Sequence, residues 1–476
     1  MALAMAYEHI SICRGPMASR RIETDTRVRG SPFQSNSNLR RAMFSVTFKT
    51  LGCKLNQAES AMMMQDFIDR GYMIADENEG SDVSVINTCT VTRRSDAKCR
   101  QAVRQALRAH PGTTVIVVGC YSQVAADQIA GISGVDYVFG VQEKLQIFKF
   151  FPGPGKLEKP VLAVTPIRNR HEVISHAAGF YGDHTRAVMK IQSGCDQHCT
   201  YCIVPAARGP RRSVPLNDVL KQAQKLIDRG YKEIVLTGVH VGEYGKECPD
   251  HPDLPALLQA LTELKSLERI RLTSLEPENI TSRLLSVISD YDQICRHFHL
   301  SFQSASPEIL KRMGRPSDAG VIRHVLQKVT DMFPEAGLGA DILVGFPGET
   351  EKNFEETREL LGQFPFSYLH VFPYSARPGT PAAMFPDQIP SRIRRERARE
   401  LRELGKTKAV AFRQRWMGRR VRVLLEGKNR NGWMSGWTSE YLRVQTRFDP
   451  ERINTLVFVE IEAVTEYGVR GCITDS

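Results

Sequence analysis

The stretch that decides the fold is Cys195-Asp196-Gln197-His198-Cys199-Thr200-Tyr201-Cys202. Its three cysteines lie at i, i+4 and i+7, directly after an apolar, strand-like run from Ala187 to Ile191. Thiolates are soft ligands, and three of them in one short loop suit an iron–sulfur cluster or zinc. Structural zinc favours four protein ligands in paired Cys-x-x-Cys knuckles, and no second knuckle accompanies this loop. The pattern therefore favours a [4Fe–4S] cluster with one iron left open for a small molecule.

The spacing Cys-x3-Cys-x2-Cys, with an aromatic residue before the last cysteine, resembles the radical S-adenosylmethionine superfamily. The resemblance implies that the open iron binds the amine and carboxylate of S-adenosylmethionine and that Tyr201 lies beside its adenine. A chance match, or another metal, is the alternative.

Length and composition bound the class of protein. The chain has 476 residues, of which 42% are hydrophobic and 25% charged, and this is ordinary for a globular protein of roughly two to four domains. We find no apolar run of about 18 residues, so no transmembrane helix and no membrane partner are expected. Eleven cysteines, an odd number, indicate a reducing compartment rather than a disulfide framework. We therefore expect a cytoplasmic protein.

The net charge of +11 is unevenly distributed. Residues 1–42 hold seven Arg against three acids, which gives +4, and residues 390–476 hold 19 basic against 11 acidic residues, which gives +8. The remaining 347 residues are therefore near −1. Positive charge gathered toward the C-terminus fits a polyanion, and RNA is the natural candidate. A solvated surface is the alternative.

Residues 1–42 show no periodic pattern and are interpreted as a disordered leader. An Arg-rich, acid-poor leader could be an organelle transit peptide. Because Met43 directly precedes the first strand-like run, an upstream choice of start codon is the preferred explanation.

Residues 43–150 alternate strand-like and helix-like runs, which predicts a small parallel sheet with helices on its faces. The strand-like runs are Ser45–Thr50, Val83–Asn87, Thr114–Gly119 and Tyr137–Gly140, and helical patterns fall near Glu59–Arg70 and Ser95–Ala109.

Cys53, Cys89 and Cys120 each follow one of the first three of these strands. Because the carboxyl ends of parallel strands meet at one edge of a sheet, we expect the three thiols to lie close together and to hold a second cluster. Three unrelated loop thiols are the alternative. Cys99 lies inside a helical run and is interpreted as an ordinary helix residue.

Residues 151–182 are interpreted as a linker, because they contain several Pro, Gly and His around one short apolar run. Residues 183–412 then alternate six strand-like runs with helical runs, which predicts an open (βα)6 barrel with its chemistry at the carboxyl ends of the strands. The strand-like runs are Ala187–Gln192, Glu233–Thr237, Arg269–Thr273, His297–Phe302, Gly339–Val344 and Tyr368–Phe372.

Polar groups and glycine turns lie at or near the ends of these strands. They are Thr237, Gly238, Ser274, Glu276, Gln303 and Asp341. As a ring they suggest a pocket for S-adenosylmethionine and substrate, although each alone could be a turn or a helix cap. Two other metal-like groups, Cys248 with His251 and Cys295 with His297 and His299, lack paired knuckles and are interpreted as loop and packing residues.

The pattern of residues 413–476 indicates short strands separated by glycines and polar turns, and this predicts a small OB-like β-barrel. The runs are Val421–Leu425, Gly432–Trp437, Leu442–Thr446 and Leu456–Val464. Aromatic and basic residues interleave here, at Trp433, Trp437, Tyr441, Arg443 and Phe448. Such a surface can stack bases and neutralise phosphates, or the aromatics can form the barrel core. The preceding Arg392–Arg402 run could be a solvated helix or the edge of a polyanion surface.

Together these motifs resemble the methylthiotransferase family. The resemblance rests on Thr50–Gln57, the Asn87–Thr90 turn, Gly119-Cys120 and the triplet of residues 195–202, and on the domain order. It covers about residues 43–475 and implies an α/β fold with an N-terminal parallel-sheet cluster domain, a radical S-adenosylmethionine barrel and a C-terminal TRAM barrel. Ser301–Ser306 departs from the usual Pro-Leu-Gln-Ser-Gly-Ser, with Ala305 in place of glycine.

The resemblance implies two [4Fe–4S] clusters, one held by Cys195, Cys199 and Cys202 and one by Cys53, Cys89 and Cys120. The first generates a radical from S-adenosylmethionine, the second carries or donates sulfur, and a second S-adenosylmethionine supplies a methyl group. A radical is needed because an aromatic C2–H bond is too inert for acid–base attack. The implied partners are tRNA, a low-potential electron donor of the flavodoxin or ferredoxin type and a sulfur donor.

Within the family, four segments are most similar to the branch that modifies C2 of N6-threonylcarbamoyladenosine at position 37 of tRNA. They are Gly52–Gln57, Ile203–Gly209, Leu236–Gly245 and Phe372–Ala383. The branches that act on isopentenyladenosine in tRNA, or on a ribosomal protein, are the nearby alternatives. An iron–sulfur RNA-binding protein without turnover is an alternative of another class, disfavoured because two three-cysteine sets each leave an iron open.

Overall fold

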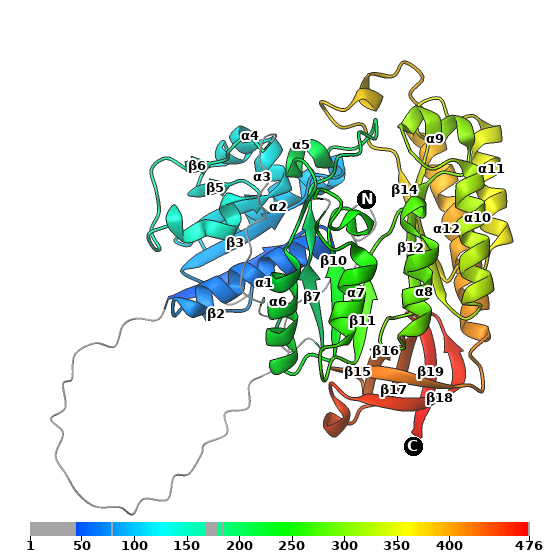
Figure 1. Ribbon diagram of the computed structural model, residues 1–476. Helices are drawn as coiled ribbons and strands as arrows, with labels where there is room; N and C mark the ends of the chain where they lie inside the picture. The colour runs from blue at the N-terminus through cyan, green and yellow to red at the C-terminus, as the bar shows by residue number, and fades with distance from the viewer. Residues whose placement is uncertain are drawn as a thin grey trace, which may run out of the picture.

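The computed structural model describes residues 44–77, 80–167, 179, 181–182, 185–248 and 250–474. Figure 1 shows an N-terminal α/β unit in blue and cyan, a green-to-yellow barrel beside it and a small red barrel at the C-terminal end. The predicted fold class is confirmed. The leader predicted at residues 1–42 lies outside the described residues. Within the described part of the chain, no helix is both long enough and apolar enough to cross a bilayer.

The N-terminal unit is a six-stranded parallel sheet in the order β2-β1-β3-β4-β5-β6. Its strands are β1 (Ser45–Thr50), β2 (Met73–Ile74), β3 (Val83–Thr88), β4 (Thr114–Gly119), β5 (Tyr137–Phe139) and β6 (Val161–Ala163). Its helices are α1 (Lys54–Asp69), α2 (Arg93–Ala109), α3 (Cys120–Val124), α4 (Ala126–Ala130) and the 3-10 helix η1 (Glu143–Lys149). β3 and β4 are buried along their whole length, as expected for parallel strands covered on both faces.

β6 corrects the prediction that residues 151–182 are only a linker. Its three residues pair with Tyr137–Phe139 of β5. The run was too short and too isolated among Pro and Gly to be recognised as a strand, and only the pairing with β5 makes it one.

The central unit contains six parallel strands in two sheets, β11-β10-β7 and β12-β13-β14. They are β7 (Arg186–Lys190), β10 (Glu233–Thr237), β11 (Arg269–Leu272), β12 (His297–Gln303), β13 (Gly337–Val344) and β14 (Tyr368–Pro373). Parallel bridges from Ile270 to Ile294 and from Leu275 to Leu300 join the two sheets. No pairing between β7 and β14 occurs in the described residues, so the barrel is open there, as predicted.

Helices cover the outside of this barrel. They are α6 (Leu216–Asp228), α7 (Leu254–Thr262), α8 (Ser282–Asp290), α9 (Pro307–Met313), α10 (Ala319–Met332), α11 (Glu351–Gln363) and α12 (Ser391–Gln414), with short 3-10 turns η2 (Val241–Glu243), η3 (Pro277–Asn279) and η4 (Pro381–Met384). Their apolar faces pack on the strands in the largest hydrophobic core of the described chain. The Arg-rich run of α12 is partly structural, because Arg397 is buried and pairs with Glu349 at 2.7 Å.

The C-terminal unit is a closed five-stranded barrel in the order β15-β16-β17-β19-β18. Its strands are β15 (Arg420–Arg430), β16 (Trp433–Trp437), β17 (Arg443–Arg447), β18 (Leu456–Thr465) and β19 (Gly468–Thr474), with the 3-10 turn η5 (Pro450–Arg452). β19 was not predicted, and it closes the barrel by pairing with β17 and β18.

The C-terminal barrel is bound to the amino ends of the central strands. Arg269 of β11 donates to the carbonyl oxygens of Trp437 and Arg422 at 2.6 and 2.7 Å. Arg271, two residues on, donates to the carbonyls of Thr438 and Ser439 at 2.8 and 2.9 Å. The chemistry predicted at the carboxyl ends of the strands is therefore at the opposite end from this contact.

Candidate active site

The cysteine triplet lies in a loop between two short strands, β8 (Gln192–Ser193) and β9 (Arg212–Ser213), and is followed by helix α5 (Val204–Arg208). Gly194 begins the loop with φ +74°, and a Cβ there would lie 1.8 Å from the carbonyl oxygen of Pro210. Only glycine fits at this position. The amide of Cys195 then donates to the carbonyl of Gly209 at 3.0 Å, so the returning strand fixes the start of the triplet.

The three thiols of the triplet are gathered in an apolar environment. Cys195 and Cys199 are buried, and Cys202 is partly buried in the same hydrophobic cluster. Burial, with a smaller contribution from another cysteine of the triplet, raises the pKa of Cys195 and of Cys202 to about 12. Backbone amides of Gln197 and Val204 nevertheless donate to the sulfurs of Cys195 and Cys202. Thiolates in such a site need a bound cationic centre, so the donor set fits a metal cluster.

Arg315 and Glu276 hold Cys199 from the barrel side. The Arg315 guanidinium forms an ion pair with Glu276, donates to the carbonyl of Ser301 and lies 4.0 Å from the Cys199 sulfur. Burial raises the pKa of Glu276, but its neighbours, Arg315 foremost among them, together bring that pKa down to about 2. Glu276 was predicted as a pocket residue, whereas Arg315 was missed because it follows α9 and is far from any strand end in sequence.

Cys53, Cys89 and Cys120 lie together at the carboxyl edge of the N-terminal sheet. They follow β1, β3 and β4, and the thiols of Cys53 and Cys89 both interact electrostatically with Cys120. Burial raises the pKa of Cys53 and, more strongly, that of Cys89. Gly52 permits this approach, because a Cβ there would lie 2.7 Å from the Cβ of Cys89.

Cys99 has a more specific place than an ordinary helix residue. It is buried in α2, accepts from the amide of Cys89 at 3.4 Å and donates to the carbonyl of Cys89 at 3.3 Å. It therefore fixes the backbone of the loop that carries Cys89. The sequence could not show this, because the contact depends on how α2 packs on the turn after β3.

A buried ionic cluster lies beside the second cysteine trio (Cys53, Cys89 and Cys120) and joins the N-terminal unit to the central barrel. Glu59 of α1 is fully buried and contacts Lys144, Lys190 and Arg208 at 2.6, 3.0 and 2.9 Å. Lys190 and Arg208 come from the central barrel. Burial raises the pKa of Glu59, but the three cations outweigh it and hold that pKa well below the usual range. Burial would lower the pKa of Arg208, yet Cys120 and Glu59 raise it overall, which places its charge near the second trio.

A pocket opens where the N-terminal unit meets the barrel. It is lined from the N-terminal unit by Val91 and Thr92 and from the barrel by Tyr201, Cys202, Ile203, Val204, Leu343, Pro373, Tyr374 and Ser375. Cys53 and Cys202, one from each set of three cysteines, pack against one shared apolar cluster. Arg377 ties the two units together, donating to Asp96 at 2.6 Å and to Thr90 at 2.7 Å. The pocket therefore lies beside the cysteine triplet and two residues beyond the loop cysteine Cys89.

The other predicted pocket residues differ in their surroundings. Thr237 is buried at the end of β10, and Gly238 lets the Gln192 side chain approach and accept from the amides of Val239 and His240 at 2.9 Å. Ser274 is half-buried. Tyr201 is buried, and among the described residues neither its hydroxyl nor the amide atoms of the Gln303 side chain have a hydrogen-bond partner.

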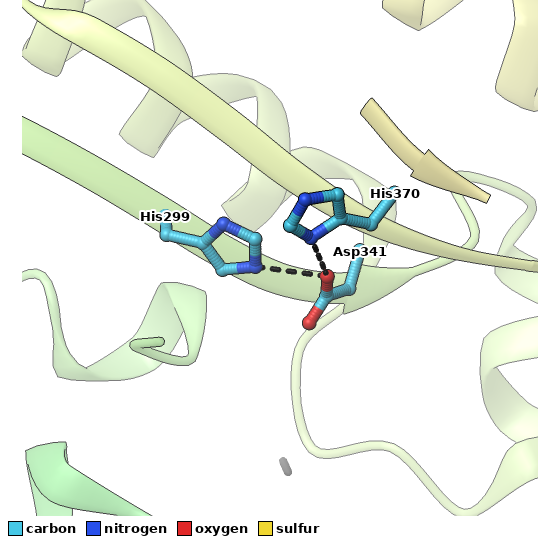
Figure 2. A group of neighbouring side chains, drawn as sticks. All are labelled: His299, Asp341 and His370. Carbon is cyan, nitrogen blue, oxygen red and sulfur yellow. Dashed lines mark ion pairs between the residues drawn. The ribbon is translucent and has the colours of Figure 1, made fainter. Parts of the chain in front are cut away.

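Asp341 belongs to a group deeper in the barrel. Figure 2 shows the rings of His299 and His370 directed at its carboxylate, with Nε2 of His299 at 2.8 Å and Nδ1 of His370 at 3.3 Å from one oxygen. Ser301 donates to the other oxygen at 3.0 Å. From the sequence, His299 is expected to be a packing residue; its pairing with Asp341 could not be predicted, because the partners come from three different strands.

The remaining metal-like residues do not form a centre within the described chain. Cys248 is exposed, and the His251 ring packs edge-on against Tyr244 at 5.3 Å. Cys295 is buried close to Arg271, and His297 stacks on Tyr441 at 4.4 Å. Their prediction as loop and packing residues agrees with this placement.

The predicted aromatic surface of the C-terminal barrel is divided in two. Trp437 stacks on Tyr441 at 4.4 Å, and Tyr441 stacks in turn on His297 of the central barrel, so these rings serve the contact between units. Trp433 instead lies under two guanidinium groups, from Arg447 at 4.5 Å and Arg470 at 4.0 Å. Phe448 packs at the edge of the barrel core.

Comparison with known proteins agrees with this geometry. Residues 189–361 match the Radical SAM superfamily, and residues 45–140 match a family described as Uncharacterized protein family UPF0004. The chain is 37% identical to the threonylcarbamoyladenosine tRNA methylthiotransferase MtaB of Bacillus subtilis, over 88% of this chain and 94% of that protein. The corresponding Aquifex aeolicus protein is also 37% identical, over 81% and 93%. The chain belongs to the radical S-adenosylmethionine methylthiotransferase family.

Members of a second branch are also similar. The tRNA-2-methylthio-N(6)-dimethylallyladenosine synthase of Methylacidiphilum infernorum is 34% identical over 82% of this chain and 85% of that protein. Among solved structures, the radical S-adenosylmethionine methyltransferase TsrM of Kitasatospora setae, with tryptophan and an S-adenosylmethionine analogue bound, is 13% identical with a TM-score of 0.51 over 71% of this chain and 75% of that one. That likeness shows the fold alone. As a methylthiotransferase, the protein uses S-adenosylmethionine and two [4Fe–4S] clusters.

Proposed function

We propose that this methylthiotransferase acts at C2 of N6-threonylcarbamoyladenosine at position 37 of tRNA. The observation that carries the proposal is the meeting of two cysteine trios from different units at one shared apolar cluster, beside a pocket that Cys202 lines. A binding protein has no need for two such sets side by side. The choice of adenosine follows the names of the relatives at 37% identity. The dimethylallyladenosine branch, at 34% identity, is the second candidate.

Within this proposal each trio has its own role. Cys195, Cys199 and Cys202 hold the cluster that binds S-adenosylmethionine, and Cys53, Cys89 and Cys120 hold the second cluster. When bound, these groups supply reductive cleavage of S-adenosylmethionine at the first site and sulfur at the second. Tyr201, Thr237, Gly238, Ser274, Glu276 and Gln303 are proposed to line the S-adenosylmethionine and substrate pocket. Asp341 is assigned to the substrate side of it.

The protein's own residues position and protect these sites. Arg315 and Glu276 keep Cys199 at a fixed place in the barrel, and Cys99 does the same for Cys89. Burial of the trios excludes water and competing donors from the reacting atoms. The Arg377 contacts to Thr90 and Asp96 hold the N-terminal unit against the barrel, and this matters because a small misplacement of the sulfur from the base slows the reaction strongly.

The proposed partners follow from the chemistry and the charge. A low-potential donor of the flavodoxin or ferredoxin type supplies electrons, and a separate sulfur donor renews the second site. The tRNA is proposed to bind along Trp433, Arg447 and Arg470, where an aromatic face and two guanidinium groups lie together. A base at position 37 lies in a single-stranded loop, where extrusion from the stack is cheap. A cytoplasmic location stays a prediction.

Mass spectrometry of tRNA nucleosides tests the proposal. Cells without the gene should lack 2-methylthio-N6-threonylcarbamoyladenosine and accumulate the form without the methylthio group, and the gene supplied in trans should restore it. A variant with Cys195→Ala should not restore it, whereas Cys472→Ser, at an exposed cysteine, should. Loss of the 2-methylthio dimethylallyl nucleoside instead would favour the second candidate, and an unchanged nucleoside profile would rule out both.

A further inference from the structure

A layer of polar side chains lines the inside of the barrel on the neighbouring strands β12, β13 and β14. Its members are His297, His299, Asp341 and His370. His299 and His370 meet the Asp341 carboxylate at 2.8 and 3.3 Å (Figure 2), whereas His297 Nδ1 has no hydrogen-bond partner among the described residues. Buried polar atoms are nearly always paired in folded proteins. A polar layer with an unpaired atom in the barrel interior therefore indicates a place where a polar ligand enters.

His370 is the member of this layer that an incoming ligand can reach. Its side chain is 39% exposed, whereas those of His299 and Asp341 are fully buried. Asp341 lies three residues before the end of β13, so the layer is about 10 Å below the carboxyl ends of the strands at 3.3 Å per residue. The layer thus lies beneath the position of a base held near the cysteine triplet.

Lys54 brings an unpaired positive charge to the same region from the N-terminal unit. It is the first residue of α1, directly after Cys53, and α1 contacts β7 beside the opening of the barrel. Its ammonium lies 5.6 Å from the centre of the Tyr441 ring, and Tyr441 stacks on His297. Lys54 is half-buried and has no carboxylate partner in the described part of the chain. An ammonium in this setting favours an anionic ligand.

The charges around the layer suit an anion beside Lys54. Burial lowers the pKa of His297 and His299, and Lys54 contributes to both shifts, so the two imidazoles are neutral and do not compete with Lys54 for an anion. Arg271, the other cation nearby, already pairs with Glu233 at 2.7 Å. Lys54 has no such carboxylate contact in the described residues, and a ligand carboxylate would supply one. Two imidazoles and the Asp341 carboxylate can also hold a divalent cation, which is the alternative that metal analysis tests.

We propose that Lys54, His299, Asp341 and His370 form the subsite for the N6 substituent of the target adenosine, with Lys54 binding its carboxylate. The proposal rests on the proposed function and names the residues that select the substituent. A threonylcarbamoyl group offers a urea, a hydroxyl and a carboxylate, which match the imidazoles, the Asp341 carboxylate and the ammonium. A dimethylallyl group would leave all of these unpaired. A site built to hydrogen-bond a substrate strongly rejects an analogue that lacks the polar groups. An apolar pocket rejects an analogue that carries an extra polar group much less strongly.

The test compares three anticodon stem-loop RNAs that differ only at N6 of adenosine 37. One carries the threonylcarbamoyl group, the second has its carboxylate converted to a carboxamide, and the third carries a dimethylallyl group. For the wild type, kcat/KM should be about 10- to 100-fold higher for the carboxylate than for the carboxamide, which is the usual worth of a charge-assisted hydrogen bond. Fluorescence anisotropy should give the lowest dissociation constant for the carboxylate RNA and higher ones for the other two RNAs.

Lys54→Met should remove this preference. Its kcat/KM should fall about 10- to 100-fold for the carboxylate RNA and little for the carboxamide RNA, so that the ratio approaches one. Because the ratio is taken within one preparation, any change in cluster loading next to Cys53 cancels. Lys49→Met, a matched substitution at a surface lysine paired with Glu77, should keep the wild-type ratio. A Lys54→Met enzyme that retains the preference would overturn the proposal.

Two further outcomes separate the possibilities. A wild type that methylthiolates the carboxylate and carboxamide RNAs equally well would overturn this subsite while leaving the proposed function intact, whereas inactivity on every threonylcarbamoyl RNA would sink the proposed function itself. Metal analysis of protein carrying Ala at all six cluster cysteines should find no bound divalent ion. One equivalent of metal that is lost on His370→Ala would show a metal site instead.

Discussion

Glu59 offers the sharpest test of how the two units are held together. Among the described residues it is the carboxylate that pairs with Lys144, Lys190 and Arg208 together, and its side chain is fully buried. Glu59→Gln keeps the shape of the side chain and removes the charge that compensates all three cations. Breaking a buried ion pair by removing one partner costs about 3–5 kcal/mol, because the other charge stays buried and uncompensated. Here three cations share one partner, so we expect the upper part of that range.

The expected result is a local loss of protection in α1 and in β7, which carry Glu59 and Lys190. Hydrogen–deuterium exchange of peptides from Lys54–Asp69 and Arg186–Lys190 should accelerate roughly 10³- to 10⁴-fold if opening is cheaper by about 4–5 kcal/mol. Peptides from the C-terminal barrel should be unchanged. The loss should also be insensitive to salt, because buried charges are poorly screened.

Glu77→Gln is the matched control. Glu77 pairs with Lys49 on the surface at 2.9 Å, with about a third of each side chain exposed, and such a pair contributes about 0–1 kcal/mol. Glu59→Gln combined with Lys144→Met should recover part of the loss, because one uncompensated cation is removed with its partner. Equal effects of Glu59→Gln and Glu77→Gln would refute the reasoning.

Three further predictions concern the clusters, the acid stability and the RNA surface. Reconstituted wild type should hold about eight irons per chain. Replacing Cys53, Cys89 and Cys120 by Ala should halve the iron content and leave S-adenosylmethionine cleavage intact. Loss of cleavage in this variant would mean that the two cluster sites do not work separately. The pKa of Glu276 is brought down to about 2, so its stabilising contribution is complete above its unfolded pKa near 4.3 and is lost only as pH falls through the folded value. In Arg315→Met, burial without the cation should raise that pKa and move acid unfolding, followed by circular dichroism, to higher pH; an unchanged midpoint would contradict the assigned pair. Arg447→Gln and Arg470→Gln should each weaken tRNA binding and lower the slope of log affinity against log salt by about one, and an unchanged slope would place the RNA elsewhere.

The sequence by itself determined the three units, the order of most strands and the two cysteine trios. These follow from local patterns: apolar runs of strand length, helical spacing between them, and cysteines placed directly after strands whose carboxyl ends must meet at one edge. The closed C-terminal barrel was foreseen for the same reason, apart from β19. That strand and β6 were missed because short runs become strands only when a neighbour supplies their hydrogen bonds.

Tertiary structure alone decided what surrounds the thiols. Arg208 and Lys190 reach Glu59 across the contact between units, and Arg377 reaches Asp96 from 281 residues away along the chain. His299, Asp341 and His370 come from three strands, and Lys54 joins them from another unit. No spacing in the sequence relates such residues. Their proximity is a consequence of packing. The cysteines, in contrast, are recognisable in the sequence, because a metal cluster needs several of them at fixed places after successive strands.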